Sequence, residues 1–208
     1  MNVPPVSKAR CIHAAFGALS ADPALAPWPE LQRLSLSLNK NGAQPKQGTD
    51  VWVGRDAESL RVLFVAADTD PWATLIERDA PLYKEEVVEV FLDTEGDGNG
   101  YFEIEVNPNN AVLDACMRRI RSGFRKDFRW QCEGLRTAVR IFEGGWAAEL
   151  AIPFGSLSGR CPAQGEAWRV NFTRIDRPKG EPRELSSWSP TGVDQFHMPE
   201  RFGELLFE

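Results

Sequence analysis

Short hydrophobic segments that alternate with polar residues recur along most of the chain, and turn-forming residues separate them. The segments are rich in Val, Ile, Phe and Trp, which is typical of β-strands. They cover residues 49–55, 60–67, 87–93, 101–106, 136–142, 146–152 and 168–175. Strands of this length and spacing predict an all-β fold, with a sandwich or barrel architecture.

The pattern predicts few helices and one domain. Short helical turns are expected at residues 29–33, 74–78 and 153–157, and no longer helical periodicity is present. No internal repeat, low-complexity segment or linker divides the sequence. We therefore predict a single domain over residues 1–208.

Residues 83–93 and 101–107 are predicted to form an antiparallel hairpin, because a Gly- and Asp-rich turn joins them. Side chains alternate between the faces of a strand, and the apolar faces must align to build a core. Glu89 then lies beside Glu103 or Glu105 on the opposite face. Such like charges repel unless a metal ion, arginines, shared protons or a polyhydroxylated ligand compensates them. The alternative is a face open to water, where screening weakens the repulsion.

The turn of this hairpin carries oxygen-bearing side chains at alternate positions, as calcium-binding loops do. They are Asp93, Glu95, Asp97 and Asn99. The segment is not an EF-hand, because its twelfth position is Ile104 and strands rather than helices flank it. A structural calcium ion at these four side chains is one alternative, and a plain polar turn is the other.

Composition and charge exclude several classes of protein. The net charge of -6 argues against a dedicated nucleic-acid or anionic-membrane binder. With 42% hydrophobic residues the chain can build a core. It has no apolar run of about 18 residues, the length that spans a bilayer. Residues 118–129 are the exception in charge, a cluster of Arg and Lys that we interpret as a solvated loop or strand edge.

The cysteines and the N-terminus leave two questions open. Cys11, Cys116, Cys132 and Cys161 are widely spaced and lack the CxxC pattern of zinc sites, so free thiols and disulfides both remain as alternatives. Residues 1–10 lack the apolar segment of a secretory signal. We therefore expect either a cytoplasmic protein or a secreted or periplasmic one whose signal has been removed.

Six stretches, in their order and spacing, resemble one known family. They are residues 83–93, 102–108, 145–154, 168–174, 187–190 and 196–203. The chain resembles a family 9 carbohydrate-binding module, a member of the DOMON-like β-sandwich group, over roughly residues 49–207. The resemblance implies a β-sandwich of two antiparallel sheets with a sugar site on one side. It also implies that calcium, where present, is structural.

The resemblance assigns roles to individual residues. Two aromatic rings sandwich the terminal sugar in such modules, and these positions fall on Tyr83 and Phe196. The acidic position of the first strand falls on Glu89, while a position that holds arginine in the xylanase-linked modules is Glu105 here. Aromatic rings cover the apolar face of a pyranose, and carboxylates accept hydrogen bonds from its hydroxyls. The departure at Glu105 bears on which sugar is accepted.

Further side chains are candidates for the same groove. Glu103 joins the other two glutamates of the hairpin in binding hydroxyls or a cation. Trp72 lies in a predicted loop that flanks the groove, and His197 lies at its edge. Trp188, between Ser and Pro residues, belongs either to the rim or to the core.

These observations predict a non-catalytic domain that binds an oligosaccharide or polysaccharide and needs no cofactor for it. The oligomeric state stays open. Replacing Tyr83 or Phe196 by Ala is expected to abolish sugar affinity and to leave the melting temperature nearly unchanged. The alternative for both rings is ordinary packing beside a groove.

An interaction domain that binds no sugar is one alternative, and two other functions are further alternatives. The first is an electron-transfer domain that binds haem b, as some DOMON domains do. Its candidate ligands are Met198, His197, Met117 and Lys84. The second is a small glycoside hydrolase with Glu89 and Glu105 as its carboxylate pair. The common sequence motifs of hydrolases, nucleotide-binding proteins and metalloproteases are absent.

Overall fold

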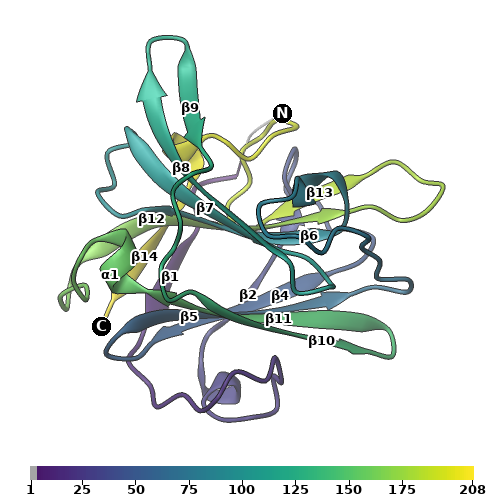
Figure 1. The fold of residues 1–208 in the computed structure, drawn as a ribbon, viewed down its shortest axis with the longest axis horizontal. Helices are drawn as coiled ribbons and strands as arrows, with labels where there is room; N and C mark the ends of the chain where they lie inside the picture. The colour runs from purple at the N-terminus through teal and green to yellow at the C-terminus, as the bar shows by residue number, and fades with distance from the viewer. Residues whose placement is uncertain (1–3) are drawn as a thin grey trace.

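The computed structural model describes residues 4–208, which fold into two β-sheets packed face to face (Figure 1). Within these residues the larger sheet has nine strands and the smaller sheet five. The larger sheet contains β1 (Lys8–Cys11), β3 (Ser37–Leu38), β6 (Val87–Asp93), β7 (Gly100–Val106), β8 (Val112–Ile120), β9 (Gly123–Asp127), β12 (Ala167–Asp176), β13 (Glu184–Ser187) and β14 (Gly203–Phe207). The smaller sheet contains β2 (Arg33–Ser35), β4 (Thr49–Arg55), β5 (Ser59–Ala67), β10 (Arg136–Phe142) and β11 (Gly145–Pro153). The predicted β-sandwich is confirmed.

Strand pairing is antiparallel with one exception among the described strands. The main path of the larger sheet is β1-β14-β12-β6-β7-β8-β9, with β13 on β12 and β3 on β13. The smaller sheet has the order β10-β11-β5-β4-β2. At one edge of the larger sheet β1 pairs with β14 in parallel. The prediction of two antiparallel sheets thus holds apart from this N-terminal strand.

Helical structure is limited to single turns in the described chain. These are η1 (Trp28–Glu30), η2 (Leu82–Lys84), α1 (Phe154–Leu157) and η3 (Pro199–Arg201). The helical turn predicted at residues 74–78 is wrong, because this segment is an irregular loop. The buried Glu85 carboxylate accepts hydrogen bonds from the backbone N–H groups of Thr74 and Leu75. These donors are therefore bound to a side chain and hold the loop in place.

The alternation of each strand divides the apolar side chains among three clusters. The main core lies between the sheets and includes Val53, Phe64, Val90, Trp146 and Trp168. A second cluster covers the outer face of the larger sheet and includes Phe91, Tyr101, Met117, Phe196 and Phe202. A third, with Trp28, Leu63 and Ala147, lies under the N-terminal segment on the outer face of the smaller sheet. Loops therefore cover both outer faces, and polar residues there become buried.

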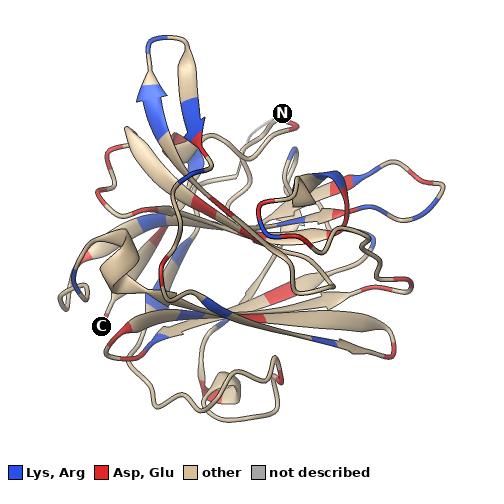
Figure 2. Cartoon of the chain, viewed as in Figure 1, with Lys and Arg blue, Asp and Glu red and all other residues tan. Residues whose placement is uncertain are grey.

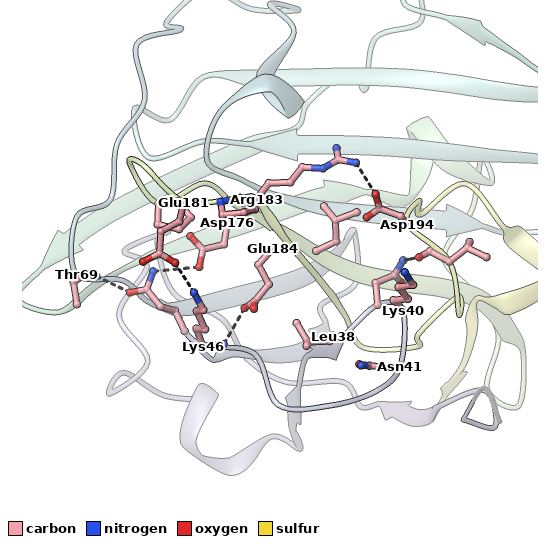
Figure 3. Close-up of a pocket in the computed structure, with 16 residues that line it drawn as sticks. Leu38, Lys40, Asn41, Lys46, Thr69, Asp176, Glu181, Arg183, Glu184 and Asp194 are labelled. Atoms are coloured by element: carbon pink, nitrogen blue, oxygen red, sulfur yellow. Dashed lines mark hydrogen bonds and ion pairs between the residues drawn. The ribbon is translucent and has the colours of Figure 1, made fainter. Parts of the chain in front are cut away.

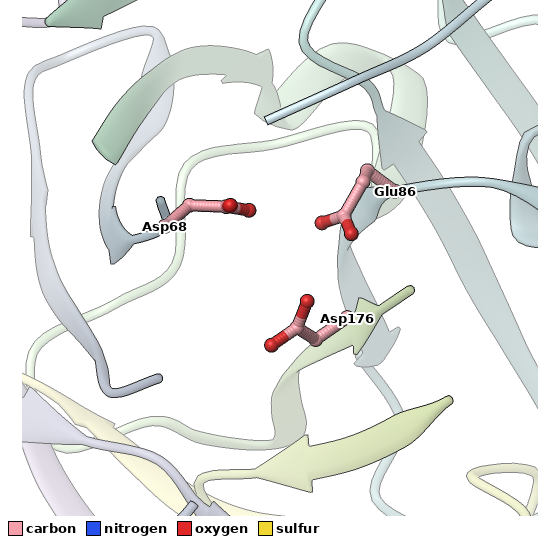
Figure 4. Close-up of side chains that lie close together, drawn as sticks. All are labelled: Asp68, Glu86 and Asp176. Carbon is pink, nitrogen blue, oxygen red and sulfur yellow. The ribbon is translucent and has the colours of Figure 1, made fainter. Parts of the chain in front are cut away.

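A buried ionic cluster connects the two sheets. The Arg174 guanidinium, on β12, lies 2.6 Å from the carboxylate of Asp68, which follows β5. The carboxylates of Glu86 and Asp176 are 3.4 and 3.5 Å from the same nitrogen. Figure 4 shows how these three carboxylates converge. A further hydrogen bond from Arg174 to the backbone oxygen of Ala67 completes the connection.

The β8–β9 hairpin projects beyond the rest of the larger sheet (Figure 1). Figure 2 shows that its strands are rich in Lys and Arg. Arg118, Arg121 and Arg125 are exposed. The interpretation of residues 118–129 as a solvated strand edge holds for these side chains, because β9 is the last strand of its sheet.

The structure also bears on the state of the cysteines and on membrane-spanning helices. Cys11, Cys116, Cys132 and Cys161 are all free in the structure. Among residues 4–208 no helix is long and apolar enough to cross a membrane.

Candidate functional site

Three glutamates lie together on the outer face of the larger sheet. Glu89 on β6 pairs directly with Glu105 on the neighbouring β7, and Glu103 lies two residues before Glu105 on the same face. Each of the three is buried. Each offers one carboxylate oxygen, and these atoms lie within 4.8 Å of one another. Of the alternatives for this face, exposure to water is therefore excluded by the surrounding loops. We call these residues the glutamate triad.

Burial dominates the electrostatics of the glutamate triad. It raises the pKa of Glu89 to about 8, with repulsion from Glu103 as the second cause. Burial also raises the pKa of Glu103 to about 7, although the ammonium of Lys126 opposes this shift. The pKa of Glu105 is raised by burial and by the two neighbouring carboxylates. The hydroxyl of Thr173 donates a hydrogen bond to Glu89 and partly offsets the cost of its charge.

A cavity of about 290 Å³ opens above two members of the triad. It is lined by Tyr83, Glu89, Glu103, Lys126, Ile175, Arg177, Arg183, Leu185, Asp194, Gln195, Phe196 and His197. Tyr83 is 39% exposed, whereas Phe196 is 6% exposed and belongs to the second cluster. Glu105 is absent from the lining and lies beneath it. Of the residues predicted from the sequence, Tyr83, Phe196, Glu89, Glu103 and His197 thus meet at one cavity.

His197 connects this cavity to the basic hairpin. Its Nε2 lies 2.9 Å from the Lys126 ammonium, and its Nδ1 lies 2.8 Å from the Tyr101 hydroxyl. Burial and the nearby Lys126 charge lower the pKa of His197 to about 4, so the ring is neutral at pH 7. Because an ammonium group only donates, Nε2 accepts and the proton resides on Nδ1. Both ring nitrogens are therefore engaged.

The haem alternative draws on residues that differ in burial and in the contacts they already make. Met117 is fully buried in the second cluster, whereas Lys84 is exposed on η2. Met198 is half-buried next to His197, whose nitrogens are already hydrogen-bonded. Haem binding would require these contacts to change, and it stays a prediction.

A second, larger cavity of about 560 Å³ lies next to the first. Its walls come from the β3 region, the loop before β13 and the segment around Asp194 (Figure 3). Lys46, Asp176 and Glu184 provide polar groups to this lining. Arg183, Leu185 and Asp194 line both cavities. An exposed ion pair of 3.3 Å between Arg183 and Asp194 thus forms part of the boundary between them.

Two tryptophans predicted for the groove lie outside its lining. Trp72 is half-buried and donates a hydrogen bond of 2.7 Å to the backbone oxygen of Arg177, which itself lines the cavity. Trp188 is 7% exposed in the main core, where it packs against Phe172. Trp72 therefore supports the wall of the cavity. Of the two alternatives for Trp188, rim or core, the structure shows the core.

The cationic residues of the cavity were missed by the sequence interpretation. Lys126 falls in the basic segment 118–129, which we assigned to solvent, yet its ammonium lies 3.7 Å from Glu103. Alternation along a strand fixes which side Lys126 faces, but β9 is exposed along most of its length, and no apolar face marks it as a strand in the sequence. Arg177 and Arg183 come from the loop between β12 and β13, and alternation gives no information about a loop.

The turn of the β6–β7 hairpin uses its acidic side chains to bind the backbone. The Asp93 carboxylate accepts hydrogen bonds from the N–H groups of Gly96 and Gly98. Asp97 accepts two further bonds from Asn99. The carboxylate clusters found among residues 4–208 are the glutamate triad and the group around Arg174, not Asp93, Glu95 and Asp97. Calcium binding in this turn stays a prediction.

Comparisons with known proteins give one matching family model and several solved structures of the same fold. A family model described as "Carbohydrate family 9 binding domain-like" matches residues 24–208. Among the curated proteins, none matches the chain significantly. A solved protein from Bacteroides uniformis ATCC 8492, proposed to bind carbohydrate, has a TM-score of 0.75 and 19% identity, with 99% of each chain covered.

A family 9 carbohydrate-binding module from Caldicellulosiruptor kristjanssonii is similar to this chain, with comparable TM-scores and sequence identities. Its complex with cellotriose has a TM-score of 0.74 and 16% identity, covering 97% of this chain and 94% of that one. Its complex with glucose has a TM-score of 0.71 and 16% identity, covering 97% and 96%. At such identities the similarity establishes the fold.

Proposed function

The chain belongs to the carbohydrate family 9 binding domain-like family, and from this premise we propose that it binds carbohydrate without cleaving it. The proposed site is the cavity between Tyr83 and the glutamate triad. The observation that carries the proposal is one exposed aromatic ring beside two buried carboxylates in a single concave surface. The related module from C. kristjanssonii forms complexes with cellotriose and with glucose.

The chemistry of the cavity suits a pyranose. The Tyr83 ring offers a flat apolar surface for the C–H face of the sugar. Glu89 and Glu103 offer oxygens that accept hydrogen bonds from hydroxyl groups. Arg177, Arg183 and the amide of Gln195 add donors for the ring and hydroxyl oxygens of the same sugar. In this arrangement the aromatic ring stacks on the sugar, and the polar side chains fix the orientation of the sugar.

The larger neighbouring cavity extends this site. Because Arg183, Leu185 and Asp194 line both cavities, a chain of sugars bound at Tyr83 continues across the Arg183–Asp194 ion pair. Lys46 and Glu184 then offer polar contacts to a second or third sugar unit. An oligosaccharide is therefore the proposed ligand, and a monosaccharide occupies only the smaller cavity.

The burial of Glu105 argues against the hydrolase alternative. Hydrolysis of a glycosidic bond uses two carboxyl groups that flank the bond. Glu105 is 1% exposed and is not among the residues that line the cavity, so a substrate there would meet Glu89 without this partner. We therefore propose binding alone, and incubation with aryl glycosides is expected to release no leaving group.

A glycan array followed by calorimetry on the best ligand tests the proposal. Tyr83→Ala is expected to weaken binding by at least tenfold, since loss of a stacking ring costs about 1.4 kcal/mol or more of binding free energy. The matched control is Phe128→Ala, which removes an exposed ring that lines neither cavity. Equal affinity of Tyr83→Ala and the wild type would contradict the site, and an array without any ligand would contradict the function.

A further inference from the structure

The glutamate triad contains buried oxygens that lack a partner. Oε2 of Glu105 accepts no hydrogen bond in the structure, and Oε2 of Glu103 accepts none but lies 3.7 Å from the Lys126 ammonium; both oxygens are inaccessible to solvent. The side chain of Glu105 is 1% exposed. A buried carboxylate oxygen without a donor is costly, so such atoms indicate a bound group that supplies positive charge or protons.

In the second carboxylate cluster of the protein, an arginine side chain compensates the negative charges. There the Arg174 guanidinium lies among Asp68, Glu86 and Asp176, 2.6 Å from the nearest oxygen. No guanidinium lies within ion-pair distance of the glutamate triad among residues 4–208. Its nearest cation is the Lys126 ammonium, 3.7 Å from Glu103 alone. In the Arg174 cluster Oδ1 of Asp176 also accepts no hydrogen bond, but it lies 3.5 Å from the guanidinium, whereas no cation lies within ion-pair distance of Glu89 or Glu105 among the described residues.

The geometry of the triad fits one shared ion. Two oxygens bound to the same Ca²⁺ at about 2.3–2.6 Å lie at most about 5.2 Å apart. The three oxygens of the triad lie within 4.8 Å of one another. Mg²⁺, with metal–oxygen distances of about 2.1 Å, demands a near-ideal octahedron, whereas Ca²⁺ accepts the irregular arrangement of three side chains from two strands. We propose that Glu89, Glu103 and Glu105 bind a calcium ion at the base of the smaller cavity.

The donor set supports a hard cation. Carboxylate oxygens prefer Ca²⁺, Mg²⁺ or Mn²⁺, whereas Zn²⁺ and Cu²⁺ favour nitrogen and sulfur ligands. His197 lies beside the triad, 3.8 Å from Glu103, but both of its ring nitrogens are hydrogen-bonded. Calcium takes six to eight oxygens, and the cavity above Glu89 and Glu103 leaves room for water ligands.

Two competitors for the calcium ion are present. The Lys126 ammonium lies 3.7 Å from Glu103 and 2.9 Å from Nε2 of His197, and its side chain is 37% exposed, so a cation can displace it towards solvent at the loss of these contacts. Protons compete as well, because burial raises the pKa values of the triad. The other groups that face the triad are His197, which is neutral at pH 7, and Arg183, whose charge favours ionised Glu89. Binding is therefore best measured at pH 8.

The cation site goes beyond the proposed sugar binding and does not depend on it. On the further premise that a sugar binds above it, the ion would offer coordination positions to sugar hydroxyls. The test below contains no sugar. Its failure overturns the cation site alone, while failure of the glycan array overturns the proposed function alone.

The experiment is a calorimetric titration of EDTA-dialysed protein with CaCl₂ at pH 8. The wild type is expected to bind one calcium ion and to melt at a higher temperature in its presence. Glu105→Gln keeps the side-chain shape, removes one ligand charge and touches no sugar in the proposed site. It is expected to weaken calcium binding at least tenfold, and Glu103→Gln serves the same purpose if that variant fails to fold.

Two control variants distinguish this site from its rivals. Asp97→Asn alters the turn that also resembles a calcium loop, and it is expected to leave affinity within twofold of the wild type. Lys126→Met removes the competing ammonium and is expected to tighten binding several-fold. Absence of saturable binding at millimolar calcium, wild-type affinity in both glutamine variants, or loss of binding in Asp97→Asn would each overturn the proposal.

Discussion

Tyr83 and Phe196 occupy paired positions in the family resemblance but differ in burial. The Phe196 ring is 6% exposed and packs against Phe91, with ring centroids 6.2 Å apart. Burial therefore revises the expectation that its loss leaves stability unchanged. Phe196→Ala is expected to lower the free energy of unfolding by about 3 kcal/mol, as for other buried rings. Tyr83→Ala is the control, with an expected loss below about 1 kcal/mol.

Chemical denaturation of the two variants measures this difference. If Phe196→Ala unfolds at the wild-type denaturant concentration, the ring contributes little to the second cluster. Its role would then be that of a stacking platform, as the sequence suggested.

The glutamate triad makes stability depend on pH in a defined direction. In the unfolded chain these groups titrate near 4.5, whereas burial raises the pKa of Glu103 to about 7 and that of Glu89 to about 8. The folded protein therefore holds more protons, and its free energy of unfolding falls as pH rises from about 4.5 to 8. Glu105→Gln is expected to reduce this slope by up to about 1.4 kcal/mol per pH unit.

Thermal or urea unfolding between pH 6.5 and 8.5, in EDTA, isolates this effect. Burial lowers the pKa of His197 from 6.5 to about 4, so this residue makes stability rise with pH mainly below 6.5, and only the end of its titration falls within the range. Burial raises the pKa values of Cys11 and Cys132 above 9.0, so the contribution of these two thiols lies above this pH range. Burial also raises the pKa of Glu86 to about 8, and a residual slope is expected. Stability that rises with pH in the wild type would contradict the prediction.

At the residue scale, alternation is sufficient to place the carboxylates but not their cations. The parity of β6 and β7 puts Glu89, Glu103 and Glu105 on one face, as the sequence pattern predicts. Whether that face is open or covered depends on loops far away in the chain, including the one that carries Phe196. Periodicity contains no information about such loops, so the burial of the triad could not be predicted.

At the scale of elements, the loop before η2 depends on one side chain. The Glu85 carboxylate accepts hydrogen bonds from the hydroxyl of Thr74 and from the N–H groups of Thr74 and Leu75. These bonds lower the pKa of Glu85 against the opposing effect of burial. The same residue lies two positions after Tyr83, so it couples the loop to the proposed stacking ring.

Glu85→Ala is expected to loosen this loop and to weaken sugar binding about tenfold, or about 1.4 kcal/mol. Hydrogen–deuterium exchange across residues 74–85 reports the loosening, and calorimetry reports the affinity. Glu77→Ala is the matched control, because Glu77 is exposed in the same loop. Equal exchange in the two variants would show that Glu85 does not hold the loop.

Seven strands were predicted close to their observed ranges, whereas β8 and β14 were missed although both carry buried side chains. β4, β6, β10 and β12 alternate clearly or are strongly apolar, and their predicted ranges agree closely with the structure. β9 is exposed along most of its length, so no apolar face marks it. β1, β3 and β13 are short and pair with segments distant in sequence. Tertiary pairing rather than local pattern defines these strands.

At the scale of the whole molecule, Arg174 connects the two sheets from within. Its guanidinium contacts Asp68, Glu86 and Asp176 in a region without solvent. Removing one partner of such a group leaves buried charges uncompensated, which costs about 3–5 kcal/mol. Arg174→Met keeps much of the side-chain volume, and we expect it to lower the free energy of unfolding by this amount. The two sheets are then expected to separate more readily.

The control is Arg140→Met, because Arg140 forms an ion pair with Asp22 near the surface of the smaller sheet. Exposed pairs contribute about 0–1 kcal/mol, so this variant is expected to unfold close to the wild type. Urea denaturation followed by tryptophan fluorescence compares the two, since Trp146 and Trp168 are buried between the sheets. If both variants lose the same small amount of stability, the sandwich is held by its apolar core, and the ionic cluster makes no net contribution.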